Sequence, residues 1–86
     1  FKIYPNILNS SATISVNLKN PENVSLNVYN LSGSVVRNLE NGFHPTGTFT
    51  VNWDGSDNSG TKLSPGIYLC TLKTLKHSST QKIVIL

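Results

Sequence analysis

The stretch VNWDGSDNSGTKLSPGIY (Val51–Tyr68) decides the fold expected for this chain. Apolar and polar side chains alternate up to Trp53, so the stretch begins in a strand with one apolar face. Asp54-Gly55 and the polar residues after it break that strand, because Asn and Asp side chains cap nearby backbone groups and Gly accepts positive φ. Pro65-Gly66 makes a second turn, and an apolar strand starts again at Ile67. The stretch therefore predicts two strands joined by a long polar connection.

Alternating residues predict further strands on both sides of this stretch. The clearest is Ala12–Lys19, where apolar and polar side chains follow one another with period two. Asn41-Gly42 predicts a hairpin-type turn, in a loop lengthened by His44–Gly47. The expected elements are an extended start at Phe1–Ile7, strands at Ala12–Lys19, Val24–Tyr29, Ser34–Leu39, Thr48–Trp53, Ile67–Lys73 and Lys82–Leu86, and a short edge at Thr61–Leu63. Six to eight short strands without a helix predict a β-sandwich in one domain.

The composition fits strands and turns and argues against several partners. Ser (11), Thr (8) and Asn (11) together supply 30 of the 86 residues, and these side chains compete with a helical backbone. The net charge of +3 comes from basic residues spread along the chain. Only Lys73 and Lys76 lie close together, beside His77, a weak indication of an anionic polymer or lipid headgroup as partner. Nucleic acid is not an expected partner, because no dense basic stripe with interleaved aromatics is present. Three Asn-x-Ser sequons are interpreted as chance matches: Asn9, Asn23 and Asn30.

No catalytic constellation is recognisable, so the chain is not expected to be an enzyme. Glu22 and Glu40 fall in or near different turns, which argues against a paired general acid and base. The oxygens of Asp54–Gly60 suit Ca²⁺, but the spacing does not match an EF-hand loop and no Glu closes the site. A turn held by its own side-chain hydrogen bonds is the favoured interpretation, and no metal or cofactor is predicted. Cys70 falls in an apolar strand and is expected to be a small buried side chain.

Aromatic residues raise the question of sugar binding. Trp53 has the inward parity of its strand, and Tyr68 starts a buried strand, so both are expected in the core. Tyr29 has the outward parity of its strand, and Phe43 lies in a predicted loop. Two scattered aromatics would form a poor platform for a polysaccharide.

The order and spacing of short motifs resemble one family over nearly the whole chain. The motifs are Tyr4-Pro5-Asn6, Thr13–Val16, Val24–Tyr29, Leu31-Ser32-Gly33, Val36-Arg37, Leu39, Trp53-Asp54-Gly55, Asp57, Gly60, Ser64–Tyr68 and Thr80–Leu86. With them, the chain resembles the type A C-terminal sorting domains of the bacterial type IX (Por) secretion system, which are related to the immunoglobulin-like domain of the flagellar hook-capping protein. It departs from that family at Ile7, where a second Pro usually follows Pro5-Asn6.

The resemblance implies an all-β, immunoglobulin-like β-sandwich of about seven short antiparallel strands, and a non-catalytic function. Such a domain, here residues 1–86, is cut from a longer secreted precursor. It directs an N-terminal passenger across the periplasm and the outer membrane to the cell surface or medium. The implied partners are the passenger, the outer-membrane secretion machinery and a sortase-like peptidase. A small sandwich that ends in an apolar strand can also form a dimer through an edge strand.

The resemblance marks three secretion-signal motifs in this sequence. Pro5 and Asn6 form the opening motif, and Gly66 and Tyr68 form the turn–strand motif. The terminal motif, expected to be read by the secretion machinery, consists of Lys82, Ile83, Val84, Ile85 and Leu86. A structural role is favoured for Gly66 and Tyr68, and Pro5-Asn6 also serves as the start of the first strand. For the terminal motif, recognition and structure are equally supported.

A second hypothesis is a structural or carbohydrate-binding immunoglobulin-like accessory module of an extracellular bacterial hydrolase. In that hypothesis Tyr29 or Phe43 contacts the polysaccharide. An independent enzyme is the least supported hypothesis, because the sequence offers no catalytic constellation.

Overall fold

The computed structural model describes residues 1–8 and 10–86. Asn9, the first of the three sequon asparagines, lies outside the described residues. Within the described residues, eight strands follow one another: β1 (Lys2–Tyr4), β2 (Ile7–Leu8), β3 (Ala12–Leu18), β4 (Glu22–Tyr29), β5 (Val35–His44), β6 (Gly47–Trp53), β7 (Gly66–Lys73) and β8 (Ser78–Ile85). The described residues contain no helix, and so none long and apolar enough to cross a membrane.

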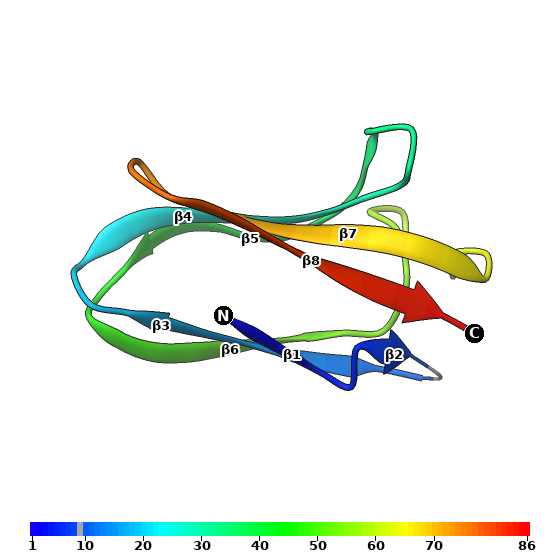
Figure 1. Ribbon diagram of the computed structural model, residues 1–86, viewed down its shortest axis with the longest axis horizontal. Coiled ribbons are helices and arrows are strands. Elements are labelled where there is room, and N and C mark those ends of the chain that lie inside the picture. The colour runs from blue at the N-terminus through cyan, green and yellow to red at the C-terminus, as the bar shows by residue number, and fades with distance from the viewer. Residues whose placement is uncertain (9) are drawn as a thin grey trace.

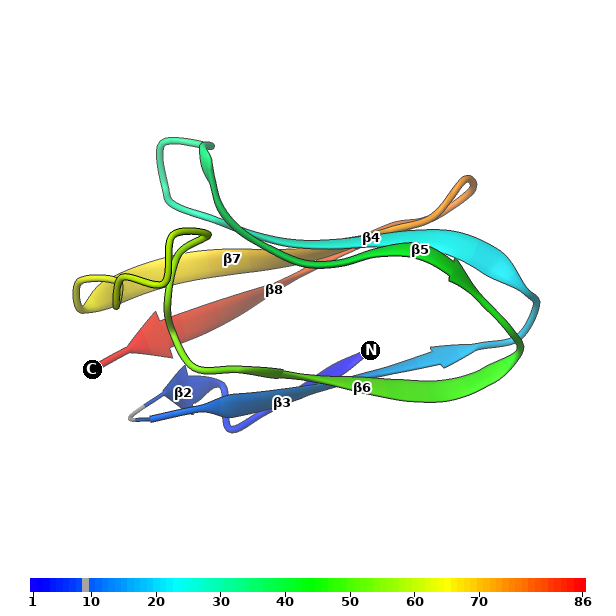
Figure 2. The same cartoon turned by 180° about the vertical axis from the view of Figure 1, so that it is seen from behind.

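The strands form two sheets that face each other (Figure 1; Figure 2 shows the opposite side). One sheet has three strands in the order β1-β3-β6, and the other has five in the order β2-β8-β7-β4-β5. Every neighbouring pair of strands is antiparallel except β2 and β8, which run parallel. The predicted β-sandwich is confirmed, with one parallel pair in place of a purely antiparallel arrangement.

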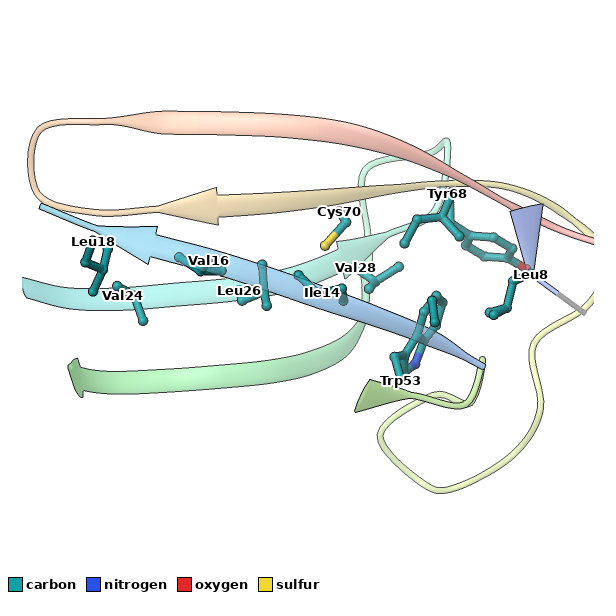
Figure 3. Close-up of a cluster of buried hydrophobic side chains, with 12 residues drawn as sticks. Leu8, Ile14, Val16, Leu18, Val24, Leu26, Val28, Trp53, Tyr68 and Cys70 are labelled. Carbon is teal, nitrogen blue, oxygen red and sulfur yellow. The ribbon is translucent and has the colours of Figure 1, made fainter. Parts of the chain in front are cut away.

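The alternation read from the sequence places every second side chain of β3 and β4 in the core (Figure 3). Trp53 and Tyr68 are 1% and 8% exposed, so the prediction that both lie in the core is confirmed. Cys70 is also fully buried, as expected for a small apolar side chain. The buried apolar side chains of the described residues are Leu8, Ala12, Ile14, Val16, Leu18, Val24, Leu26, Val28, Trp53, Tyr68, Cys70 and Ile83.

The hairpin turn predicted at Asn41-Gly42 is wrong. These residues lie inside β5 and pair with β4. The strand continues to His44 and the chain turns at Pro45-Thr46, where the His44 ring stacks on Phe49 with centroids 3.9 Å apart. Pairing with β4 along the whole strand therefore outweighs the local turn preference of Asn-Gly. For the same reason Glu40 and Phe43, assigned from sequence to turns and loops, lie within β5.

Two smaller differences concern the ends of predicted elements. The short edge expected at Thr61–Leu63 is reduced to a single bridge between Lys62 and Ser56. The last strand is longer than expected, since β8 begins at Ser78 and not at Lys82. Both differences arise where polar residues carry no clear alternating pattern, and β8 is extended because Ser78–Gln81 pair with the end of β7.

Candidate functional site

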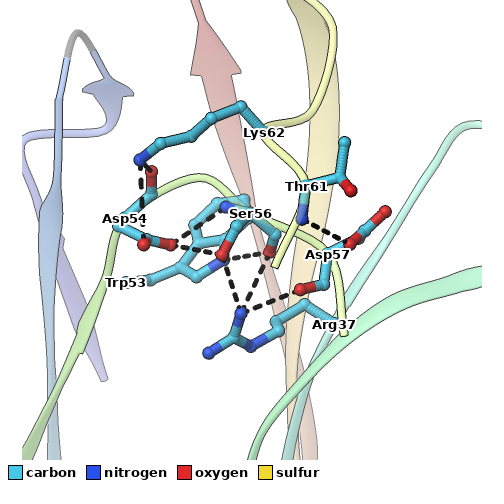
Figure 4. A network of polar contacts seen from close by, with 7 residues as sticks. All are labelled: Arg37, Trp53, Asp54, Ser56, Asp57, Thr61 and Lys62. Atoms are coloured by element: carbon cyan, nitrogen blue, oxygen red, sulfur yellow. Dashed lines mark hydrogen bonds and ion pairs between the residues drawn. The ribbon is translucent and has the colours of Figure 1, made fainter. Parts of the chain in front are cut away.

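The Asp54–Gly60 loop is anchored to β5 by an arginine (Figure 4). Arg37 Nη1 donates to Ser56 Oγ at 2.8 Å and to the Asp57 carbonyl oxygen at 2.9 Å. The Trp53 indole N–H donates to the Ser56 carbonyl oxygen at 2.9 Å, on the core side of the same turn. Charge-assisted bonds from a guanidinium to carbonyl oxygens are among the stronger hydrogen bonds in proteins. The loop is therefore fixed between the two sheets.

Asn58 adds a sheet-like contact with the outer edge of β5. Its backbone N–H donates to the Val36 carbonyl oxygen at 3.0 Å. Its side-chain oxygen accepts from the Asn38 N–H at 2.9 Å, and its amide donates to Asn38 Oδ1 at 2.8 Å. These bonds cover part of an edge that would otherwise be open to another strand.

Both carboxylates of the loop accept hydrogen bonds within it. Asp54 accepts from the Ser56 hydroxyl and N–H, and Asp57 accepts from the Ser59 hydroxyl and from two backbone N–H groups. The Ser56 hydroxyl is the main reason that the pKa of Asp54 is lowered, and the Ser59 hydroxyl is the main reason for Asp57. No group of three or more His, Cys, Asp or Glu placed to hold a metal ion occurs in residues 1–8 and 10–86. The predicted turn, held by its own side chains, is confirmed.

We expect these two carboxylates to make the domain less stable in acid. A carboxyl group whose pKa is lowered by folding binds protons more readily in the unfolded chain. The stabilisation is complete above the ordinary pKa of 3.8 and is lost as the pH falls through the lower folded value. Urea unfolding at a series of acidic pH values measures the decline, which Asp57→Asn should make shallower below 3.8. Identical acid profiles for the wild type and Asp57→Asn would contradict the expectation.

The three secretion-signal motifs lie together at one end of the five-stranded sheet. β2 follows Pro5-Asn6 and pairs with the end of β8, which pairs on its other side with the start of β7. The Val84 N–H donates to the Asn6 carbonyl oxygen at 2.9 Å, and the Leu86 N–H donates to the Leu8 carbonyl oxygen at 3.1 Å. Motifs from the two ends of the chain and from the start of β7 therefore form one three-stranded unit.

Gly66 and Tyr68 build the turn and the strand on which β8 pairs. Tyr68 lies opposite Ile83, and its hydroxyl donates to the Ser64 carbonyl oxygen at 2.7 Å. A tyrosine bonded to the backbone a few residues upstream also occurs in immunoglobulin-like sandwiches as the tyrosine corner. Gly66 lies opposite Ile85, and a Cβ there would be 4.0 Å from the Tyr68 ring, an ordinary contact. These contacts support the structural role favoured for both residues.

The terminal motif is divided between the two faces of the sheet. Ile83 is completely buried in the core, and Ile85 is half-buried and packs against the same core. Lys82 and Val84 have the opposite parity and therefore point away from the core. Leu86, directly after the end of β8, is exposed. The apolar run thus supplies a core element and an exposed surface at once.

The outward residues of the terminal motif join two isoleucines in an apolar patch. Val84 is in register with Ile7 of β2 on one side and with Ile67 of β7 on the other. Ile7 is 52% exposed, Ile67 is 42% exposed, and Leu86, beyond Val84, is 69% exposed. We name Ile7, Ile67, Val84 and Leu86 the terminal-strand patch, with Lys82 beside it on β8. Ile7, the residue that departs from the family's Pro-Asn-Pro pattern, is therefore part of this patch.

Gly55 brings the polar loop into contact with the inner side of the same strands. It is buried with φ of +80°, and a Cβ there would lie 3.3 Å from Leu8 Cδ2 and 3.9 Å from Ile85 Cδ1. Only glycine adopts this φ without strain. The Trp-Asp-Gly turn therefore packs directly beneath the terminal strand.

Gly55→Ala is expected to lower the free energy of unfolding by about 1–2 kcal/mol, from backbone strain and the close contact with Leu8. Gly60→Ala is the matched control, because Gly60 has a φ of +90° and no atom within 4 Å of its Cβ position. Urea unfolding should show a larger loss at Gly55 than at Gly60. Equal losses would mean that the contact beneath the terminal strand contributes nothing.

The remaining candidates from the sequence do not form a site. Burial raises the pKa of the Cys70 thiol to about 12, so this thiol is neutral and closed to solvent. Tyr29 is half-buried at one end of β4, while Phe43 lies opposite Asn23 near the other end. Six residues of extended strand separate the two positions by about 20 Å. Tyr29 and Phe43 therefore do not form one stacking surface for a sugar chain.

The fold and the arrangement of the motifs define an immunoglobulin-like β-sandwich domain whose last strand belongs both to the core and to the surface. A family model of the FlgD Ig-like domain matches residues 5–78. The chain belongs to this family, and the relation to the hook-capping protein predicted from the sequence is confirmed. No curated protein matches the chain by sequence.

Three solved structures illustrate the likeness. FlgD from P. aeruginosa is 33% identical with a TM-score of 0.63, and the match covers 86% of this chain and 58% of FlgD. Dimeric latent PorU from Porphyromonas gingivalis is 21% identical with a TM-score of 0.73, covering 99% of this chain and 9% of PorU. PorZ, an essential surface component of the type IX secretion system of the same organism, is 17% identical with a TM-score of 0.70, covering 99% of this chain and 11% of PorZ. PorU and PorZ thus share the fold, and this chain spans only a part of each protein.

Proposed function

We propose that this chain is a non-catalytic C-terminal sorting domain that directs an attached passenger through the type IX secretion system to the cell surface or medium. The terminal-strand patch is the observation that carries the proposal. A small domain that only has to fold gains nothing from exposing Ile7 and Ile67 on either side of Val84, with Leu86 exposed beyond it, and contiguous exposed apolar side chains mark interaction surfaces.

The extent of the structural matches also supports the proposal. The matches to PorU and PorZ span 99% of this chain and therefore include β8. The family model ends at Ser78, where β8 begins, and the match to FlgD from P. aeruginosa covers 86% of the chain. The strand that carries the patch is thus common to this chain and two proteins of an organism with type IX secretion.

The proposed recognition acts through side chains and not through backbone pairing. Both edges of the end of β8 are already bonded, to β7 and to β2. A partner therefore meets the outward side chains, with Lys82 as the charged group beside the apolar patch. In this proposal the partner is the outer-membrane secretion machinery. The passenger precedes Phe1 in the same precursor, and a sortase-like peptidase separates the two after export.

A fusion experiment tests the function. A reporter enzyme with a periplasmic export signal is joined through a flexible linker to the N-terminus of residues 1–86. The fusion is expressed in a bacterium with an intact type IX system and in the same strain without its outer-membrane translocon. The reporter is expected in the medium or on the cell surface of the first strain and in the periplasm of the second. Periplasmic retention in both strains would refute the proposal and leave a structural module as the better hypothesis.

We further propose that any dimer forms through β6. β6 is an outer edge of the three-stranded sheet and carries no charged side chain, whereas Asn58 covers part of the β5 edge. Sedimentation equilibrium should show a dimer that Thr50→Lys dissociates, because a charge on an edge strand opposes pairing. A wild-type monomer at high concentration would exclude the dimer without affecting the sorting proposal.

A further inference from the structure

The β7–β8 hairpin projects from the end of the sandwich opposite the terminal-strand patch (Figures 1 and 2). Leu75 at its tip is 93% exposed, more than any other large apolar side chain of the described residues. Phe43, near the end of β5, is 65% exposed. Leu75 and Phe43 line one shallow groove together with Pro21, Lys76 and His77. Two apolar side chains therefore lie exposed together at this end.

Lysines surround these apolar side chains. Lys73 and Lys76 flank Leu75 in the hairpin, and Lys19 lies in the β3–β4 connection at the same end. None of the three lysines belongs to either of the ion pairs found among residues 1–8 and 10–86, which are His44–Glu40 and Lys62–Asp54.

The two ends of the sandwich differ in how far their carboxylates neutralise the nearby basic side chains. At the hairpin end, Glu40 lies 3.3 Å from His44, which leaves Glu22 as the carboxylate in the groove. At the other end, Lys62 lies 3.7 Å from Asp54 and donates to its carbonyl oxygen at 2.6 Å. The hairpin end therefore has an excess of lysines around an apolar tip.

We infer that the hairpin end docks on a lipid surface with anionic headgroups. Leu75 and Phe43 enter the headgroup region, and the three lysines contact the phosphates around them. Apolar side chains with a basic rim bind at the boundary between headgroups and acyl chains, and each lysine near an anionic surface strengthens binding about fivefold. A protruding tip suits lipid, because mobile headgroups close around it without a shaped cavity. This inference does not depend on the secretion proposal.

Vesicle co-sedimentation of the 86-residue chain tests the inference. Binding is expected to vesicles of equimolar phosphatidylcholine and phosphatidylglycerol, to weaken with added salt, and to be lost on phosphatidylcholine alone. Leu75→Ser should weaken binding roughly fivefold or more, and the double variant Lys73→Gln/Lys76→Gln about 25-fold. Leu31→Ser is the matched control, because Leu31 is 68% exposed in the turn at the opposite end. It should bind like the wild type.

A second measurement separates insertion from attraction by charge alone. In Leu75→Trp, fluorescence from the hairpin tip should be quenched by brominated phospholipid, while the buried Trp53 supplies a constant background. The inference would be overturned if the wild type did not bind anionic vesicles, or if Leu75→Ser and Leu31→Ser bound equally. It would also be overturned if the Leu75→Trp fluorescence were not quenched. A lipid-free dimer that Leu75→Ser dissociates would overturn it as well, because the occupant would then be a second copy of the chain.

Discussion

Trp53→Ala is expected to lower the free energy of unfolding by about 3–5 kcal/mol, as aromatic-to-alanine changes in cores do. Trp53 is 1% exposed and lies opposite Ala12 in the β3–β6 pair, so the small neighbour offers nothing to fill the space. The change also leaves the Ser56 carbonyl oxygen without the indole N–H. A domain of this length has a total stability of roughly 4–13 kcal/mol, so the change would remove about a quarter of it or more.

Trp53→Phe separates the two contributions. It keeps an aromatic ring in the core and removes the N–H, so a smaller loss of about 1–2 kcal/mol is expected. Urea unfolding followed by far-UV circular dichroism measures both variants without relying on the tryptophan signal. A loss below about 1 kcal/mol for Trp53→Ala would mean that Trp53 is not the anchor between the sheets.

Deletion of Lys82–Leu86 is expected to abolish both the fold and the secretion of the passenger. The deletion removes the completely buried Ile83 and the pairing of β8 with β2 and with the start of β7. Tyr68 and Leu8 would then be uncovered, and the edge of β7 would be open. The expected result is loss of cooperative unfolding, together with retention of the passenger inside the cell. A truncated chain that unfolds cooperatively with an unchanged midpoint would contradict this role of β8.

This truncation by itself does not separate recognition from structure. The truncation removes core residues and exposed residues together. Ile83 and Ile85 pack in the core, while Lys82, Val84 and Leu86 are at the surface. Changes confined to the outward set leave the core intact. They are therefore the variants that distinguish a sorting signal from a strand needed only for folding.

The parts of the fold that the sequence predicts are those where each residue's environment follows from its neighbours. Strict alternation at Ala12–Leu18 and the inward parity of Trp53 depend only on the period of a strand. Asn41-Gly42 is misleading, because its local turn preference competes with pairing along β4 that no local pattern records. The position of Asn58 against β5 likewise depends on a contact across twenty residues of chain, with Asn38.

The sequence predicts some members of the candidate site but not their arrangement. The resemblance marks Pro5, Asn6 and the terminal motif, yet their contact depends on the parallel pairing of β2 with β8, which joins the two ends of the chain. Ile7 and Ile67 are absent from the predicted set, because they enter the patch only through their register with Val84. Long-range register is the step that a single sequence does not determine.

The most direct test of the sorting proposal measures secretion of the reporter fusion carrying Lys82→Ala, Val84→Thr and Leu86→Ser together. The control carries Leu31→Ser and Val35→Ser, two exposed apolar positions outside the terminal-strand patch. Unfolding of the isolated domains must first show that both variants fold. Secretion of the patch variant is then expected to fall at least about tenfold, equivalent to about 1.4 kcal/mol of lost recognition, while the control is secreted like the wild type. Wild-type secretion by a folded patch variant would contradict the proposal that the terminal strand is the sorting signal.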